Sequence, residues 1–177
     1  MRNHLNSNAA RIALAGVLSA GSVVFLWAAC LSPTGRLGLN AVAGLFPMVG
    51  VLMSGRAVGY LCWIVTGLLS LILLPDKGVA LLYLLFFGLY PVLKSRFETG
   101  KNPVFSWALK LVYFNVVLAV SVFVLRGLFL SALPEFLQHI PVIWLLGNIV
   151  FIVYDIGLSR LIFGFFCRMG LDGSKRK

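Results

Sequence analysis

The stretch Ile12-Ala-Leu-Ala-Gly-Val-Leu-Ser-Ala-Gly-Ser-Val-Val-Phe-Leu-Trp-Ala-Ala-Cys-Leu31 contains no charged side chain. It is about 20 residues long, the length that an α-helix needs to cross a hydrocarbon core of about 30 Å. The apolar segment of a secretory signal has only about 7–15 residues, so this stretch predicts a retained membrane-spanning helix. Five more apolar stretches follow it. Together they predict an all-α fold, a polytopic transmembrane bundle of six helices.

The six helices are expected at residues 12–31, 37–53, 57–74, 79–93, 105–130 and 142–166, within one membrane domain covering residues 1–177. Breaker residues separate them, as in Ser32-Pro33-Thr34-Gly35 and Pro75-Asp76-Lys77-Gly78. The chain is 60% hydrophobic and 11% charged, whereas soluble domains carry about 25% charged residues. A soluble chain of this size could not bury so much apolar surface, so lipid must solvate most of it.

The basic residues predict the orientation of these helices. With the N-terminus in the cytoplasm, three basic residues lie on the outer side, namely Arg36, Lys77 and Arg126. The other twelve of the fifteen lie on the inner side: Arg2, Arg11, Arg56, Lys94, Arg96, Lys101, Lys110, Arg160, Arg168, Lys175, Arg176 and Lys177. This positive-inside bias predicts a multi-pass protein of the bacterial inner membrane with both termini in the cytoplasm.

The net charge of +10 does not indicate nucleic-acid binding, because the basic residues sit at helix ends and in short connections. Anionic lipid headgroups are the expected partner of these charges. Cys30, Cys62 and Cys167 show no CxxC spacing and no neighbouring His, so we expect neither a metal site nor a cofactor. Motifs of hydrolases and phosphate-binding enzymes are missing as well, which predicts no catalytic residues and no enzyme.

Three polar residues are expected at membrane depth: Lys110, Asn115 and Asp155. An acid there is costly and faces protein or water. Asp155 could therefore serve proton coupling or substrate contact, but an ion pair with Lys110 that joins two helices is the favoured interpretation. Asn115 is expected to bridge helices by hydrogen bonding.

A second polar set is expected near the outer face, where Arg36, Asn40, Arg126 and Asn148 are the candidate substrate-binding residues. If Arg36 and Arg126 converge, their guanidinium groups would accept a carboxylate or phosphate. The alternative for Arg126 is a side chain that snorkels from the end of its helix.

Small residues recur at helical spacing in the first helix, including Ala13, Gly16 and Ala20. Such a face lets two helices approach closely. Two alternatives remain open: the face packs inside this protein's own bundle, or it docks a helix of a partner protein.

The segment Ala9–Ala20, the short glycine-rich helix after Pro33-Thr-Gly-Arg36, and the run Leu81-Leu-Tyr-Leu-Leu-Phe-Phe-Gly-Leu-Tyr-Pro-Val-Leu-Lys94 carry a resemblance. Trp107-Ala-Leu-Lys110 and Phe114-Asn115 extend it. With its size and six-helix plan, the chain resembles the substrate-binding S-components of energy-coupling factor transporters, or a small membrane family close to them. The resemblance implies a chain without ATPase activity that binds a vitamin-like small molecule at the outer side.

The same resemblance implies partners, a coupling membrane subunit and ATPases that would tilt this chain to release its substrate inwards. The outer arginines would favour an anionic substrate. The main alternative is an MreD-like structural or assembly scaffold, in which the polar residues join helices. A weaker third possibility is a membrane enzyme that uses Asp155 with Lys110. A polar outer interior would favour the transporter, and an outer half that is packed shut would favour the scaffold.

Overall fold

The computed structural model describes residues 7–32, 35–97, 103–124 and 140–168. The chain divides into two compact units, unit 1 (Met1–Ala132) and unit 2 (Leu133–Lys177). Six helices in the described ranges are long and apolar enough to cross a membrane. The predicted all-α, six-helix fold is therefore confirmed.

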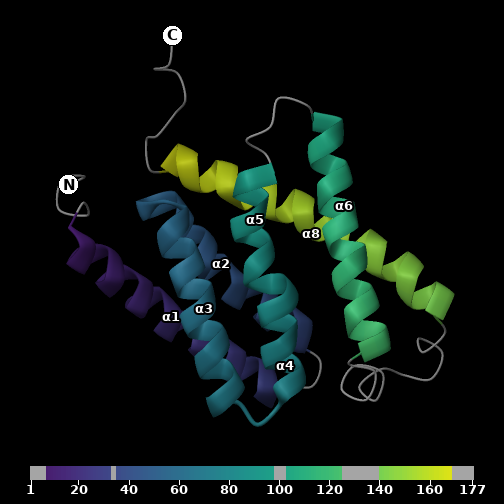
Figure 1. Cartoon of the computed structure of the whole chain (residues 1–177), viewed down its shortest axis with the longest axis horizontal. Coiled ribbons are helices and arrows are strands. Elements are labelled where there is room, and N and C mark those ends of the chain that lie inside the picture. The colour runs from purple at the N-terminus through teal and green to yellow at the C-terminus, as the bar shows by residue number, and fades with distance from the viewer. Residues whose placement is uncertain (1–6, 33–34, 98–102, 125–139, 169–177) are drawn as a thin grey trace. The chain divides into compact units, whose positions relative to one another are not determined.

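Unit 1 begins with three single helices, α1 (Asn8–Leu31), α2 (Arg36–Ser54) and α3 (Arg56–Leu73). Its fourth span is one continuous helical segment (Figure 1). It consists of α4 (Lys77–Leu82), the π-helix η2 (Tyr83–Phe87) and α5 (Leu89–Phe97). The fifth is α6 (Pro103–Ala119) with the π-helix η3 (Val120–Val124). Unit 2 is described only for α8 (Ile140–Arg168).

Several predicted helix ends need correction. The first span was expected to begin at residue 12, but α1 begins at Asn8. The fourth span was expected to end at residue 93 after Pro91, but α5 continues to Phe97. Pro91 is the third residue of α5 but lies inside the continuous fourth span, so it removes one backbone donor without ending the helix. The sixth span, expected over residues 142–166, runs from Ile140 to Arg168. Of the predicted fifth helix, residues 125–130 lie outside the described ranges.

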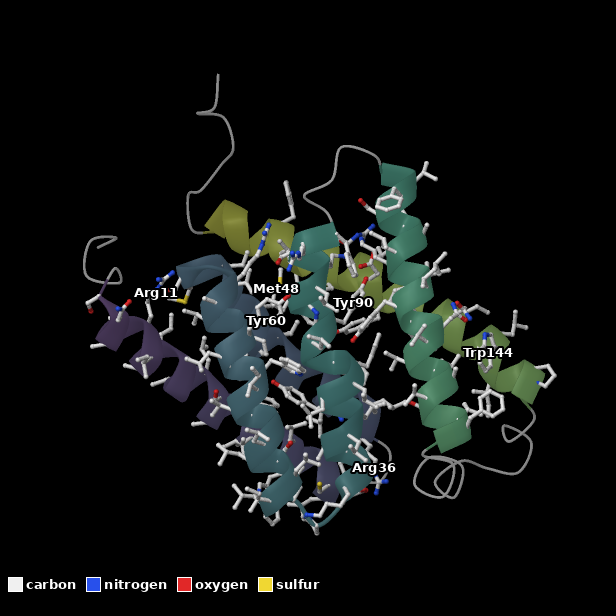
Figure 2. The ribbon with its side chains drawn as sticks, in the orientation of Figure 1. Arg11, Arg36, Met48, Tyr60, Tyr90 and Trp144 are labelled. Carbon is white, nitrogen blue, oxygen red and sulfur yellow. The ribbon has the colours of Figure 1, made fainter. Side chains whose placement is uncertain are left out.

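Arginines bind carbonyl groups at one end of unit 1. Arg11 of α1 donates to the carbonyl of Ser54 at 2.9 Å, and Arg56 of α3 donates to that of Ser95 at 3.2 Å. Ser54 is the last residue of α2, and Ser95 lies two residues before the end of α5. The last carbonyls of a helix have no donor within the helix, so they need partners from elsewhere. Arg36 lies at the opposite end of unit 1 (Figure 2), as expected for helices that alternate in direction.

Pro47 lies inside α2 and changes the hydrogen bonding of its own helix. Proline has no N–H, so the carbonyl four residues earlier, that of Ala43, loses its helical donor. The hydroxyl of Ser22 on α1 replaces that donor and lies 2.9 Å from the Ala43 oxygen. Since lipid offers no hydrogen bonds, a freed carbonyl in a membrane helix must find its partner on another helix.

This replacement predicts coupling between Ser22 and Pro47. Ser22→Ala should lower the free energy of unfolding by roughly 0.6–1.7 kcal/mol, the range for hydrogen bonds between membrane helices. In a Pro47→Ala background, the backbone N–H of the new alanine supplies the donor, so the same change should have almost no effect. A double-mutant cycle of unfolding in detergent measures the difference. Equal losses in both backgrounds would contradict the replacement.

The π-helix η2 frees further carbonyls for contacts between helices. Gly88 N donates to the carbonyl of Tyr83 at 2.8 Å, five residues back. The carbonyl of Leu84 instead accepts from Trp63 Nε1 of α3 at 3.0 Å, and that of Leu85 accepts from the Tyr113 hydroxyl of α6. The π-turn thus links the fourth span to two neighbouring helices through its backbone.

Gly44 of α2 meets η2 more closely than any other residue type would permit. A Cβ atom at this position would lie 2.1 Å from the carbonyl oxygen of Phe87 and 2.8 Å from its carbonyl carbon. Phe87 is four residues before Pro91, so its carbonyl also lacks a helical donor. Small residues let the backbones of membrane helices approach in this way, and Gly44 thereby sets the distance between α2 and the fourth span.

Candidate functional site

An ion pair holds the outer candidate Arg36. Its Nη1 lies 2.9 Å from Oδ2 of Asp76, and the two side chains are 38% and 28% exposed. Asp76 also caps α4, because its Oδ1 accepts from Gly78 N at 2.8 Å. The first residue of α2 is thereby tied to the start of α4. The positive charge of Arg36 is matched by a carboxylate of the same unit.

The other predicted outer cation, Arg126, lies outside the described residues, so its convergence with Arg36 stays a prediction. Lys77, the remaining outer basic residue, donates from Nζ to the carbonyls of Leu71 and Leu74 at 2.7 and 2.8 Å. It thus closes the end of α3 and compensates the negative end of the helix dipole.

Asn40, a predicted substrate-binding residue, is fully buried four residues after Arg36. Its Nδ2 donates to the carbonyl of Val79 at 3.0 Å and so joins α2 to α4. Its Oδ1 is buried and accepts no hydrogen bond. A buried acceptor without a donor is uncommon and needs a physical explanation, such as an ordered water, an ion or a bound ligand.

Asn40 is one of a set of uncharged polar residues in the interior of unit 1. The members come from α1, α2, α3 and η2, and each is at most 1% exposed. We call this set the buried polar centre: Ser19, Ser22, Asn40, Cys62, Thr66 and Tyr83. Burying uncharged side chains such as these inside a membrane bundle costs least where hydrogen-bond partners are available.

Neighbour relations connect the members of the buried polar centre. Ser19 Oγ donates to the carbonyl of Cys62 at 3.4 Å, and the Cys62 thiol lies beside the side chains of Ser19 and Thr66. The Tyr83 hydroxyl lies beside Ser22 and Thr66. Asn40 is one helical turn before Ala43, the acceptor of Ser22. Val79, the acceptor of Asn40, is one turn before Tyr83.

Two hydroxyls of the buried polar centre, Thr66 Oγ1 and Tyr83 Oη, make no hydrogen bond of ordinary length and angle, although they lie beside each other and the Tyr83 hydroxyl also lies beside Ser22. The Tyr83 ring lies so close to Gly88 that a Cβ there would be 2.7 Å from its Cε1 and Cζ. This contact fixes the direction of the hydroxyl. With Asn40 Oδ1, three oxygens from three different segments remain able to bind a polar guest.

The sequence-based prediction included Asn40 but missed Ser22, Thr66 and Tyr83. A usable signal is present in α3, where Cys62, Thr66 and Ser70 recur every four residues along one face. A polar or small residue at this spacing marks the interior face of a membrane helix, because the lipid-facing side favours larger apolar residues.

The small residues predicted for partner docking lie on the outward face of α1. Ala13, Gly16 and Ala20 are all exposed, and a Cβ added at Gly16 would meet no atom within 4 Å. The buried face of the same helix is formed by other residues, namely Ala15, Ser19, Ser22, Leu26 and Ala29. Packing within unit 1 therefore does not use the predicted face, and docking of a partner helix there stays a prediction.

The predicted intramembrane residues of α6 take local partners. The Nζ atom of Lys110 lies 5.3 Å from the centroid of the Trp107 ring, a cation–π arrangement within one turn. Asn115 Nδ2 donates to the carbonyl of Leu111 at 2.9 Å in the same helix. The role of Asn115 as a bridge between helices stays a prediction.

Asp155 and Asn148 are on α8 in unit 2. The carbonyl of Asp155 accepts from Ser159 Oγ at 2.9 Å, and Asn148 Nδ2 donates to the carbonyl of Trp144 at 2.8 Å. Lys110 and Asp155 therefore belong to different units, and their ion pair stays a prediction. Nor does Asn148 share a unit with Arg36 and Asn40.

No group of three His, Cys, Asp or Glu side chains within the described ranges is arranged to hold a metal ion. No family model matches the chain, and no curated protein or solved structure matches it. The function is therefore inferred from the residues themselves.

Proposed function

We propose that this chain is the substrate-binding membrane subunit of a small-molecule uptake transporter of the bacterial inner membrane, with both termini in the cytoplasm. The substrate is a vitamin-like molecule. The chain carries no ATPase or other enzymatic activity, and a coupling membrane subunit with ATPases supplies the energy. The observation that carries the proposal is the buried polar centre, with Asn40 Oδ1, Thr66 Oγ1 and Tyr83 Oη unpartnered.

The physical argument concerns what a membrane bundle tolerates. A protein with a purely structural role gains nothing from leaving polar atoms unpaired in its interior, since each one costs about 1–3 kcal/mol. A binding protein needs such atoms, because they exchange their hydrogen bonds with a guest. Ser22, Asn40 and Thr66 also belong to three different helices, so a ligand among them would contact most of unit 1.

The outward face of α1 supports the second half of the proposal, the coupling partner. Ala13, Gly16 and Ala20 leave the backbone of α1 open to close approach by another helix. Such contacts are how membrane helices associate when lipid supplies no hydrophobic driving force.

An MreD-like scaffold remains the second candidate because one observation favours it. Ser19, Ser22 and the amide nitrogen of Asn40 all donate to backbone carbonyls of neighbouring helices. These bonds are typical of polar residues that only join helices.

A mild-detergent purification of the tagged protein from its native membrane, read by mass spectrometry, tests the proposed function. We expect recovery of a coupling membrane subunit together with ATPases. Recovery of cell-wall or division proteins in their place would overturn the transporter and favour the scaffold. An unrelated six-span protein with the same tag, expressed at the same level, controls for proteins that bind any membrane bundle.

A further inference from the structure

The buried polar centre also indicates what kind of molecule it binds. Its unpartnered atoms are an amide oxygen, which only accepts, and two hydroxyls, which donate and accept. None of its six members is a charged residue. A guest must therefore bring at least one hydrogen-bond donor for Asn40 Oδ1, and it finds no counter-ion there.

The positive charges at the nearby helix ends are already compensated. Arg36 pairs through Nη1 with Asp76 at 2.9 Å, which leaves its buried Nε without a hydrogen-bond partner. Lys77 donates to the carbonyls that end α3. An anionic guest would have to share Arg36 with the carboxylate of Asp76 or enter the interior without compensation. Burying an unpaired charge among apolar helices is far more costly than burying a hydrogen-bonded neutral group.

We propose that the buried polar centre binds a small uncharged molecule with hydrogen-bond donors, held by Asn40, Thr66 and Tyr83. The inference deepens the proposed function, on which its role as a transport site rests. Binding itself needs no partner protein. Ser22 contributes less, because its hydroxyl is already bonded to Ala43.

Cys62 provides a native reporter within this site. It is fully buried as a free thiol beside Ser19 and Thr66. The protein in lipid nanodiscs is treated with three methanethiosulfonates of similar length, the neutral hydroxyethyl, the anionic carboxyethyl and the apolar propyl reagent. Peptide mass spectrometry then gives the rate at each cysteine separately. A matched control is Val58→Cys in a Cys62→Ala background, since Val58 is buried one turn away on the same face of α3.

The hydroxyethyl reagent should modify Cys62 at least about a hundredfold faster than the carboxyethyl reagent, because the anion finds no counter-charge. It should also modify Cys62 faster than the cysteine at position 58. Three results would overturn the proposal: equal rates at both positions, equal rates for the neutral and anionic reagents, or fastest reaction with the propyl reagent at both positions. The last would indicate entry from lipid through a loosened bundle.

The labelling of Cys62 and the detergent purification test different claims, so either one can fail while the other succeeds. Slow labelling of Cys62 alongside recovered ATPases would place the substrate elsewhere in a transporter. Selective labelling without ATPases would leave an uncharged-ligand site in a protein with another role. Thr66→Val, which removes one hydroxyl at constant shape, should reduce the preference for hydroxyethyl over propyl at Cys62. An unchanged preference would argue against the role assigned to Thr66.

Discussion

Gly44→Ala is expected to disrupt the packing of unit 1 more than any other single-methyl change in α2. The added Cβ would lie 2.1 Å from the carbonyl oxygen of Phe87. Neither partner has a flexible side chain to move, since the contact is between two backbones. The helices must separate, and overpacking of this kind costs roughly 1–3 kcal/mol or more.

Moving η2 away from α2 would also affect two other helices, because side chains of α3 and α6 donate hydrogen bonds to η2. Its carbonyls at Leu84 and Leu85 accept from Trp63 and Tyr113. Moving η2 away from α2 would strain these bonds too. We therefore expect Gly44→Ala to lower the unfolding temperature sharply in detergent, measured as the monodisperse fraction after heating.

Gly38→Ala is the matched control for this prediction. Gly38 is on the same helix, and a Cβ there would meet nothing within 4 Å. Alanine is favoured over glycine inside helices by up to about 1 kcal/mol, so this variant should be as stable as the parent or slightly more stable. Equal heat sensitivity of the two variants would show that the Gly44–Phe87 contact does not limit stability.

Gly16→Leu should have the opposite effect to Gly44→Ala: the protein should stay folded but should no longer bind its coupling subunit. The new side chain points into open space on the outward face of α1. The unfolding temperature should stay close to that of the parent. Recovery of the coupling subunit should fall to background, because a bulky side chain prevents close approach of the partner helix. Both quantities are measured on the same preparation.

Gly21→Leu on the same helix separates the two effects. A Cβ at Gly21 would lie 2.6 Å from Cε1 of Phe46, on the face that packs inside unit 1. This variant should therefore lose stability directly. If Gly16→Leu retained full recovery of the partner, the outward face of α1 would not be the docking surface. If it unfolded like Gly21→Leu, the face would have a structural role.

The sequence alone determined the number of spans and the approximate ends of most of them. In lipid most backbone groups are satisfied within their own helix, so a span requires a long, uncharged, helical run, and that signal is local. The breaks at Ser32–Gly35 and Pro75–Gly78 are local for the same reason. Asn40 was identified because it belongs to the polar set that the sequence assigns to the outer side.

Tertiary structure decided which residues meet. Convergence of Arg36 with Arg126 was one of two alternatives that the sequence left open, and it stays a prediction. The described partner of Arg36 is Asp76, because α2 and α4 begin close together. Nothing in either segment encodes that proximity. The exposure of Gly16 likewise could not be predicted from the sequence, because it depends on which face of α1 packs against the other helices of unit 1.

The interior of unit 1 also combines features that the sequence predicts with contacts that only the tertiary structure decides. Pro47 and Pro91 mark in sequence where carbonyls lose their donors, but the donors and contacts that replace them come from other helices. Ser22 bonds the carbonyl freed by Pro47, and Gly44 admits the carbonyl freed by Pro91. Hydropathy depends on each residue's own chemistry. A binding centre depends on distances between helices, and these are set by close contacts that only the folded chain creates.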